Sequence, residues 1–198
     1  MNLNPRATPK CVRAVIGVAA VLLSLSPISG QSQQERFTGF AINMNSGPKT
    51  GTIDFMVERW STDEERNALL AILQEEKDAT RANAQLLKAL QKMPKAGNIR
   101  TPQTLAWDLR YAHQAPLEGG GRRIVVATDR PIGFREARNQ SRSMDYPFTL
   151  VEIRLDASDR GEGKILAGTR LLVDKNNHLV LENYGQQPIR FNEIRKLK

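Results

Sequence analysis

The chain has 198 residues, with 29 basic and 21 acidic side chains, a formal charge of +8 at pH 7 and one cysteine, Cys11. The basic excess is spread along the chain without a helix-turn-helix, zinc-ligand or aromatic RNA-binding pattern, so nucleic acid is not predicted as a partner. A lone cysteine excludes an internal disulfide.

The first thirty residues have the pattern of a secretory signal peptide. Basic residues and no acidic one precede an almost wholly apolar stretch, 14–25, and small residues follow it. The apolar stretch is shorter than the roughly 20 residues of a comfortable membrane span. We expect cleavage after Gly30 or Ser32, which leaves a single mature domain, 31–198, in the periplasm or outside the cell, with no transmembrane span. The alternative is an uncleaved membrane anchor.

The mature domain would carry a formal charge of +5, because the removed segment holds three basic residues and no acidic one. It would also lack cysteine, which excludes disulfides and thiol chemistry. A lipid anchor is not expected, because a lipidated cysteine must follow the apolar stretch and Cys11 precedes it. About 168 residues suffice for one hydrophobic core.

Residues 36–44 and 50–60 alternate apolar and polar side chains, and 45–49 has the composition of a turn, so a β-hairpin is predicted. Residues 61–64 (Ser-Thr-Asp-Glu) have the pattern of a capping box, and a leucine-rich helical stripe follows them. A second amphipathic helix is predicted from about 78 to 93. We interpret both helices as covers for a sheet.

Strand patterns return after the helices and persist to the C-terminus. They cover 105–112, 122–128, 148–155, 164–173, 178–183 and 189–194. Short strands separated by polar turns favour consecutive antiparallel pairing. The chain therefore predicts an α+β domain: a curved antiparallel sheet or small β-barrel of about eight strands, with a two-helix insertion after the second.

Two groups of residues are candidates for ligand binding. Trp107 and Tyr111 are placed on one face of the same predicted strand, where they would line an apolar cavity or simply fill the core. The long segment 129–146 carries four arginines, whose guanidinium groups suit anions. These arginines are Arg130, Arg135, Arg138 and Arg142. The alternative is that they pair with acidic residues of the same segment and hold it in place.

Two phrases, ATDRPIGF at 127–134 and MDYPFTL at 144–150, resemble a group of exported bacterial proteins of unknown function. The resemblance extends to the strand at 53–60, the capping box after it and LENY at 181–184, so it covers most of the mature domain. It implies a bacterial, exported, single-domain protein. It implies no catalytic residue.

Motifs for chemistry are weak throughout. His113 and His178 have no neighbouring pattern of nucleophile and orienting partner, so both are interpreted as residues at solvent-facing strand ends. Two histidines without a cysteine do not predict a zinc site. Residues 156–162 are acidic but lack the spacing of a calcium loop, so a β-turn is the better interpretation. We predict no metal, no cofactor and no catalytic residue.

Two hypotheses follow. The first is a non-catalytic binding or interaction module whose sheet cavity or barrel mouth, covered by 129–146, takes an apolar or anionic small ligand or an envelope protein. The second is a periplasmic, glycosidase-like hydrolase whose acid–base pair comes from carboxylates such as Asp129, Glu136 and Asp145. The first assumes fewer unseen features, so binding is preferred over enzymatic activity.

Overall fold

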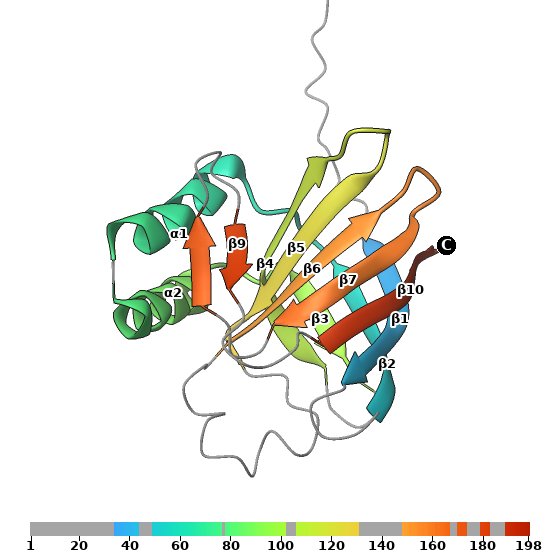
Figure 1. Ribbon diagram of the computed structural model, residues 1–198, viewed down its shortest axis with the longest axis horizontal. Coiled ribbons are helices and arrows are strands. Elements are labelled where there is room, and N and C mark those ends of the chain that lie inside the picture. The colour runs from blue at the N-terminus through green and yellow to red at the C-terminus, as the bar shows by residue number, and fades with distance from the viewer. Residues whose placement is uncertain are drawn as a thin grey trace, which may run out of the picture. The chain divides into compact units, whose positions relative to one another are not determined.

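Alternating apolar and polar residues build a closed antiparallel β-barrel with two helices against its outer side (Figure 1). The computed structural model describes residues 34–43, 49–76, 78–101, 106–130, 148–166, 170–173, 179–182 and 189–198. All of them belong to one compact unit, Gln31–Lys198. The predicted export signal lies outside the described residues.

Eight of the ten described strands close the barrel in the order β1, β10, β7, β6, β5, β4, β3 and β2. Their bounds are β1 (Glu35–Asn43), β2 (Lys49–Val57), β3 (Gly97–Arg100), β4 (Trp107–Pro116), β5 (Arg122–Thr128), β6 (Thr149–Leu155), β7 (Arg160–Leu166) and β10 (Ile189–Leu197). The other two, β8 (Arg170–Val173) and β9 (Leu179–Glu182), pair in a separate hairpin, and β8 lies against helix α1 (Asp63–Glu75). The second helix, α2 (Ala79–Lys92), follows α1, and both are inserted between β2 and β3.

The predicted α+β barrel with a two-helix insertion is confirmed, but its strands differ from the prediction in two places. Residues 97–100 form β3, a strand too short to show an alternating pattern. The segment 164–173, predicted as one strand, is divided between the end of β7 and the whole of β8. Compared with the prediction, the barrel therefore includes β3 and excludes the hairpin of β8 and β9.

Large apolar side chains fill the interior of the barrel. The ring of Phe37 stacks on that of Phe55 with centroids 4.7 Å apart, and Phe191 packs against Phe55 at 6.4 Å. Gly39 faces this cluster, since a Cβ atom there would lie 2.7 Å from Cε2 of Phe191. The other large side chains that are fully buried include Ile53, Ile99, Leu109, Ile124, Ile153, Leu155, Ile165 and Ile194.

Helix α1 begins one residue later than the capping pattern predicts. Its N-cap is Thr62, whose side chain accepts from the backbone N–H of Glu65, while the Glu65 carboxylate accepts from the backbone of Thr62. Ser61 is buried and bonds β4 instead. Its backbone N–H donates to the carbonyl of Ala112 over 2.6 Å, and its Oγ accepts from the Ala112 N–H over 3.2 Å. The capping box is therefore real, but its first residue is Thr62.

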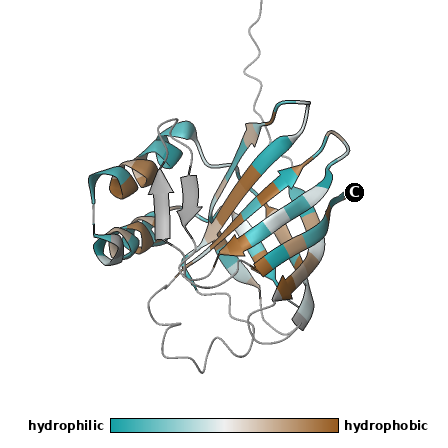
Figure 2. Cartoon of the chain, viewed as in Figure 1, coloured by the Kyte–Doolittle hydropathy of each residue, from teal (hydrophilic) through white to brown (hydrophobic). Residues whose placement is uncertain are grey.

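Both helices cover the outer face of the barrel, as predicted. Leu86 and Leu90 of α2 form a second apolar cluster with barrel residues, and Leu69 and Leu73 of α1 pack against it. The barrel side of this cluster consists of Tyr111, Ala127, Phe148, Leu150 and Leu166. Figure 2 accordingly shows brown stretches along β5 and β6 and alternating bands along β7 and β10. Within the described residues, α1 and α2 both fall short of the length and apolarity that crossing a membrane requires.

A charged cluster joins strands from opposite sides of the barrel. The Arg122 guanidinium donates to Glu35 Oε2 over 2.7 Å and to Asp159 Oδ1 over 2.7 Å, and its Cζ lies 5.5 Å from the centre of the Phe37 ring. The Nζ atom of Lys196 lies 3.0 Å from the same Glu35 carboxylate. Burial alone would raise the pKa of Glu35, but the hydrogen bonds from Arg122 and Lys196 outweigh it and lower that pKa below its ordinary value of 4.5.

This shift makes the stability of the fold depend on pH. A lowered folded-state pKa means that the ionised Glu35 stabilises the fold above about pH 4.5, and that this contribution is lost as the pH falls through the folded-state pKa. We expect Glu35→Gln to lower the free energy of unfolding at neutral pH by about 1–3 kcal/mol. The difference from the wild type should shrink in acid, as measured by urea unfolding across a pH series. Glu162→Gln, at an exposed position of β7, is the control and should follow the wild type throughout. A difference that stays constant in acid would contradict the prediction.

Candidate functional site

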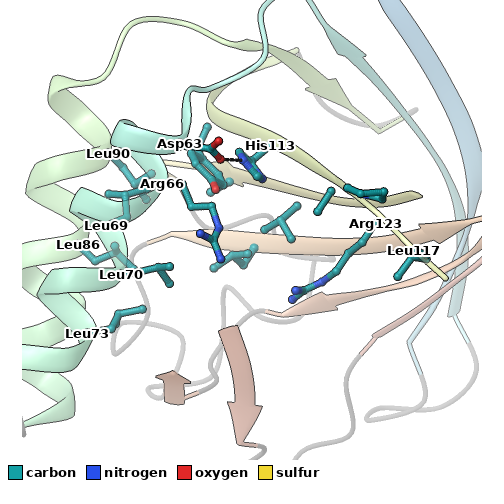
Figure 3. A pocket seen from close by; sticks show the side chains of 16 residues that line it. Asp63, Arg66, Leu69, Leu70, Leu73, Leu86, Leu90, His113, Leu117 and Arg123 are labelled. Carbon is teal, nitrogen blue, oxygen red and sulfur yellow. Dashed lines mark hydrogen bonds and ion pairs between the residues drawn. The ribbon is translucent and has the colours of Figure 1, made fainter. Parts of the chain in front are cut away.

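A cavity of about 320 Å³ lies between the helices and the outer face of β4, β5 and β6. Leucines from α1 and α2 form one wall, and strand residues form the other (Figure 3). The residues that line it are Asp63, Arg66, Leu69, Leu70, Leu73, Leu86, Leu90, Tyr111, His113, Ala115, Pro116, Leu117, Arg123, Val125, Ala127 and Leu150.

The strand wall becomes more polar along its length. Neighbouring positions on β4, β5 and β6 form three rungs across it. The inner rung is Tyr111, Ala127 and Leu150; the middle rung is His113, Val125 and Glu152; the outer rung is Ala115, Arg123 and Arg154. The inner rung belongs to the apolar cluster under α2, and the outer rung lies beside the turn between β4 and β5. Of these residues, Glu152 and Arg154 do not line the cavity, so its inner end is mainly apolar, with the Tyr111 hydroxyl as its polar group, and Arg123 is the charged side chain at its outer end.

A β-bulge in β4 decides which residues face this cavity. Leu109 pairs with Thr128 but Tyr111 pairs with Ala127, so Arg110 is an extra residue without a partner on β5. The extra residue reverses the alternation of the strand. Trp107 before the bulge packs against the barrel interior, while Tyr111 after it faces the helices. The prediction that Trp107 and Tyr111 share one face is therefore wrong, and only Tyr111 lines the cavity.

A hydrogen bond joins α1 to the middle rung. Nε2 of His113 lies 2.9 Å from Oδ1 of Asp63, and the His113 ring stacks on Tyr111 with an interplanar angle of 8°. Arg66 lies one helical turn after Asp63 and lines the same space. The first turn of α1 thus brings one carboxylate and one guanidinium to the cavity, and the histidine holds the carboxylate.

Arg123 approaches from the opposite wall. Its Nε donates to Oε1 of Glu152 over 3.0 Å, and Arg154 donates to the same oxygen over 3.3 Å. The Arg123 side chain is largely buried, with 18% exposed, whereas that of Arg154 is 68% exposed. Figure 3 shows the guanidinium groups of Arg66 and Arg123 turned toward the space between α1 and the strands. An anion placed there would meet donors from both walls.

Of the loop arginines proposed from sequence, only Arg130 belongs to the described residues, and it does not line the cavity. Arg130 is exposed, and its backbone N–H donates to Oγ1 of Thr128 over 2.9 Å. The other three, Arg135, Arg138 and Arg142, lie outside the described residues, as does the rest of the segment predicted to cover the barrel mouth. The cavity itself lies on the outer side of the barrel, under the helices.

The proposed catalytic acids receive no support as a pair. Asp129 accepts from Nε of Arg110 over 3.1 Å, so it is engaged in an ion pair at the bulge. Glu136 and Asp145 lie outside the described residues. Among the described residues, no group of three His, Cys, Asp or Glu side chains gathers in a way that would hold a metal ion. Asp156 caps its own turn, because its Oδ1 accepts from the backbone N–H groups of Ser158 and Arg160.

Sequence reasoning missed the charged residues of the cavity, although a signal for them was present. Arg66 precedes Leu69, Leu70 and Leu73 at helical spacing, so it continues the apolar stripe that faces the barrel. His113, interpreted from sequence as a solvent-facing residue, is half-buried instead. His178 lies outside the described residues. A charged residue in register with an apolar face is the pattern that identifies such a site.

Comparison of the chain with known protein families, with curated proteins and with solved structures finds no match. The resemblance to exported bacterial proteins therefore stays a prediction. The fold class is an eight-stranded antiparallel barrel with a helical cover, and the cavity lies between these two layers.

The buried position of Tyr111 predicts an unusual alkaline titration. Burial raises the pKa of the Tyr111 phenol well above its ordinary value of 10.0, and the nearby Arg66 and Arg123 offset only part of this effect. We expect an ultraviolet titration of the folded protein to show a late-ionising tyrosine, and Tyr111→Phe to remove that late step. In urea, wild type and variant should both titrate near the ordinary value and differ only in amplitude. A late step that survives in Tyr111→Phe would contradict the assignment.

Proposed function

We propose that this protein is a non-catalytic binding module that works in the periplasm or outside the cell and holds a small, largely apolar ligand in the cavity between helices and barrel. The observation that carries the proposal is this cavity of about 320 Å³, lined mainly by aliphatic side chains with a few polar groups among them. Small-molecule sites have this composition and volumes of roughly 300–1,000 Å³.

The location of the cavity supports binding at the helix–barrel interface. The barrel interior is occupied by its own side chains, so the space lies between two packed layers. Its helical wall comes from an insertion between β2 and β3 that is tied to β4 through Ser61. A ligand there would extend the apolar cluster of Leu86 and Leu90 and remove further apolar surface from water.

The chemistry of the lining supports holding a ligand over transforming it. His113 and Asp63 form a pair that can move a proton, but a base of this kind needs a nucleophile beside it. Among the described residues that line the cavity, none is a serine, threonine or cysteine. The Asp63 carboxylate is also 79% exposed, which is a poor environment for a tuned acid–base group.

Export is tested by the N-terminus of the mature protein. When the full chain is produced in a bacterial host, we expect the form recovered from a periplasmic extract to begin at Gln31 or Gln33. Native mass spectrometry of this material should show a retained small molecule that organic extraction releases. Full-length protein found only with the membrane fraction would contradict cleavage, and an apo mass under all conditions would count against tight binding.

Filling the cavity tests whether it is the binding site. Val125 lies on the middle rung and lines the space, so Val125→Trp should occupy it. With the neutral dye N-phenyl-naphthylamine as the probe, we expect the fluorescence increase seen with the wild type to fall at least about tenfold, because the apolar volume is no longer open. Met56→Trp, which adds the same ring to the outer face of β2, is the control and should bind the dye as the wild type does. Equal dye binding by both variants would contradict the proposed site.

A further inference from the structure

The charged end of the cavity defines the class of ligand more closely. We propose that the ligand is a single-chain amphiphile with an anionic head, a carboxylate or a phosphate monoester, which the guanidinium groups of Arg66 and Arg123 bind from opposite walls. This inference rests on the proposed function, since it takes the same cavity as the binding site. It adds the charge of the head, the shape of the tail and the orientation of the molecule.

The orientation follows from the three rungs. The inner rung and the leucines of α2 form the more apolar end, where Leu86 and Leu90 are 3% and 1% exposed and the Tyr111 hydroxyl is the polar group. The outer rung carries Arg123, beside the turn that leads from β4 into β5. A tail therefore extends inward under α2, and the head remains at the outer end, where its charge stays partly hydrated.

The sign of the head follows from the charges that line the outer end. Two guanidinium groups, those of Arg66 and Arg123, face the cavity, against one carboxylate, that of Asp63. The Asp63 carboxylate is already engaged, because its Oδ1 lies 2.9 Å from Nε2 of His113. Each arginine makes contacts within the protein, but a guanidinium has five N–H donors and can bind an anion in addition. An anionic head is thus favoured over a cationic one.

The two arginines are suited to this role because different layers position them. Arg66 stands on the first turns of α1, and Arg123 is oriented on β5 by its bond to Glu152. Figure 3 shows the two side chains approaching the same space from the helix and from the strands. A bound head would therefore link the helical cover to the barrel through two charge-assisted hydrogen bonds.

The size of the cavity limits the tail. A volume of about 320 Å³ lies near the lower end of the roughly 300–1,000 Å³ range of small-molecule sites. The wall residues are mainly aliphatic and come from both helices and from β4, β5 and β6, and the stacked rings of Tyr111 and His113 lie on the strand side. One unbranched aliphatic chain fits this shape and chemistry, whereas a two-chain lipid requires a larger space.

The first experiment compares ligands that share a tail and differ in the head. Binding of dodecanoate, dodecyl phosphate, dodecanol and dodecyltrimethylammonium to the mature protein is measured by displacement of N-phenyl-naphthylamine, below the micelle concentrations. We expect one or both anions to bind at least about tenfold more tightly than the alcohol, and the ammonium ion to bind most weakly. The tighter of the two anions identifies the head group.

The second experiment removes the arginines one at a time. Arg66→Met and Arg123→Met each keep an apolar stem, and we expect each to weaken binding of the anionic amphiphile by about tenfold while leaving dodecanol binding unchanged. Arg154→Met is the matched control, because Arg154 contacts the same Glu152 oxygen but does not line the cavity. It should bind all four probes as the wild type does. Unchanged dodecanol binding also shows that each variant is folded.

The outcomes separate this inference from the proposed function. If neither dodecanoate nor dodecyl phosphate binds more tightly than dodecanol, or the ammonium ion binds best, the anionic head is wrong while the apolar cavity remains a binding site. If Arg154→Met and Arg123→Met weaken binding of the anionic amphiphile equally, the effect comes from Glu152, which both arginines contact, and the inference is also overturned. If neither the dye nor any probe binds, the proposed function and the inference both fail.

Discussion

One extra residue in β4 determines how the barrel and its helical cover meet. Arg110 has no partner on β5, so the strand presents Leu109 to the interior and Tyr111 and His113 to the helices. Just beyond the bulge, β3 no longer pairs with β4, and Ser61 supplies two hydrogen bonds to Ala112 in its place. The bulge and this anchor lie together. They set where the insertion leaves the barrel and which side chains it covers.

The apolar strands β5 and β6, which follow the bulged strand in the barrel, contribute side chains to both apolar clusters. On β5, Ile124 and Val126 face the barrel interior while Ala127 faces the helices, and Val151 and Leu150 divide in the same way on β6. Burial on both faces removes more apolar surface from water on these two strands than burial on one face would. The cavity lies between the helical layer and the outer faces of these strands. A cavity therefore forms without removing a side chain from the barrel core.

The fold was largely predictable from local sequence, because alternation and polar turns identify half-buried strands and a capping pattern identifies a helix start. The errors have physical causes. The strand at Gly97–Arg100 is too short for a period to appear. The pattern across 164–173 is apolar both in β7 and in β8, so nothing local shows that the chain leaves the barrel between them. Ser61 and Thr62 are both suitable caps, and only the contact with Ala112 distinguishes them.

The sequence by itself determined that Arg66 lies on the apolar stripe of a helix and that Arg123 alternates with Val125 on a strand. It did not determine that these two side chains face one space. That arrangement depends on the pairing of Arg123 with Ala115, on the bulge that turns β4 outward and on the hydrogen bonds of Ser61, which place α1 over the middle rung. Each of these is a contact between segments far apart in the chain, and a local period carries no information about register. The helices and strands could therefore be predicted from the sequence, while the arrangement of the cavity residues depended on tertiary structure.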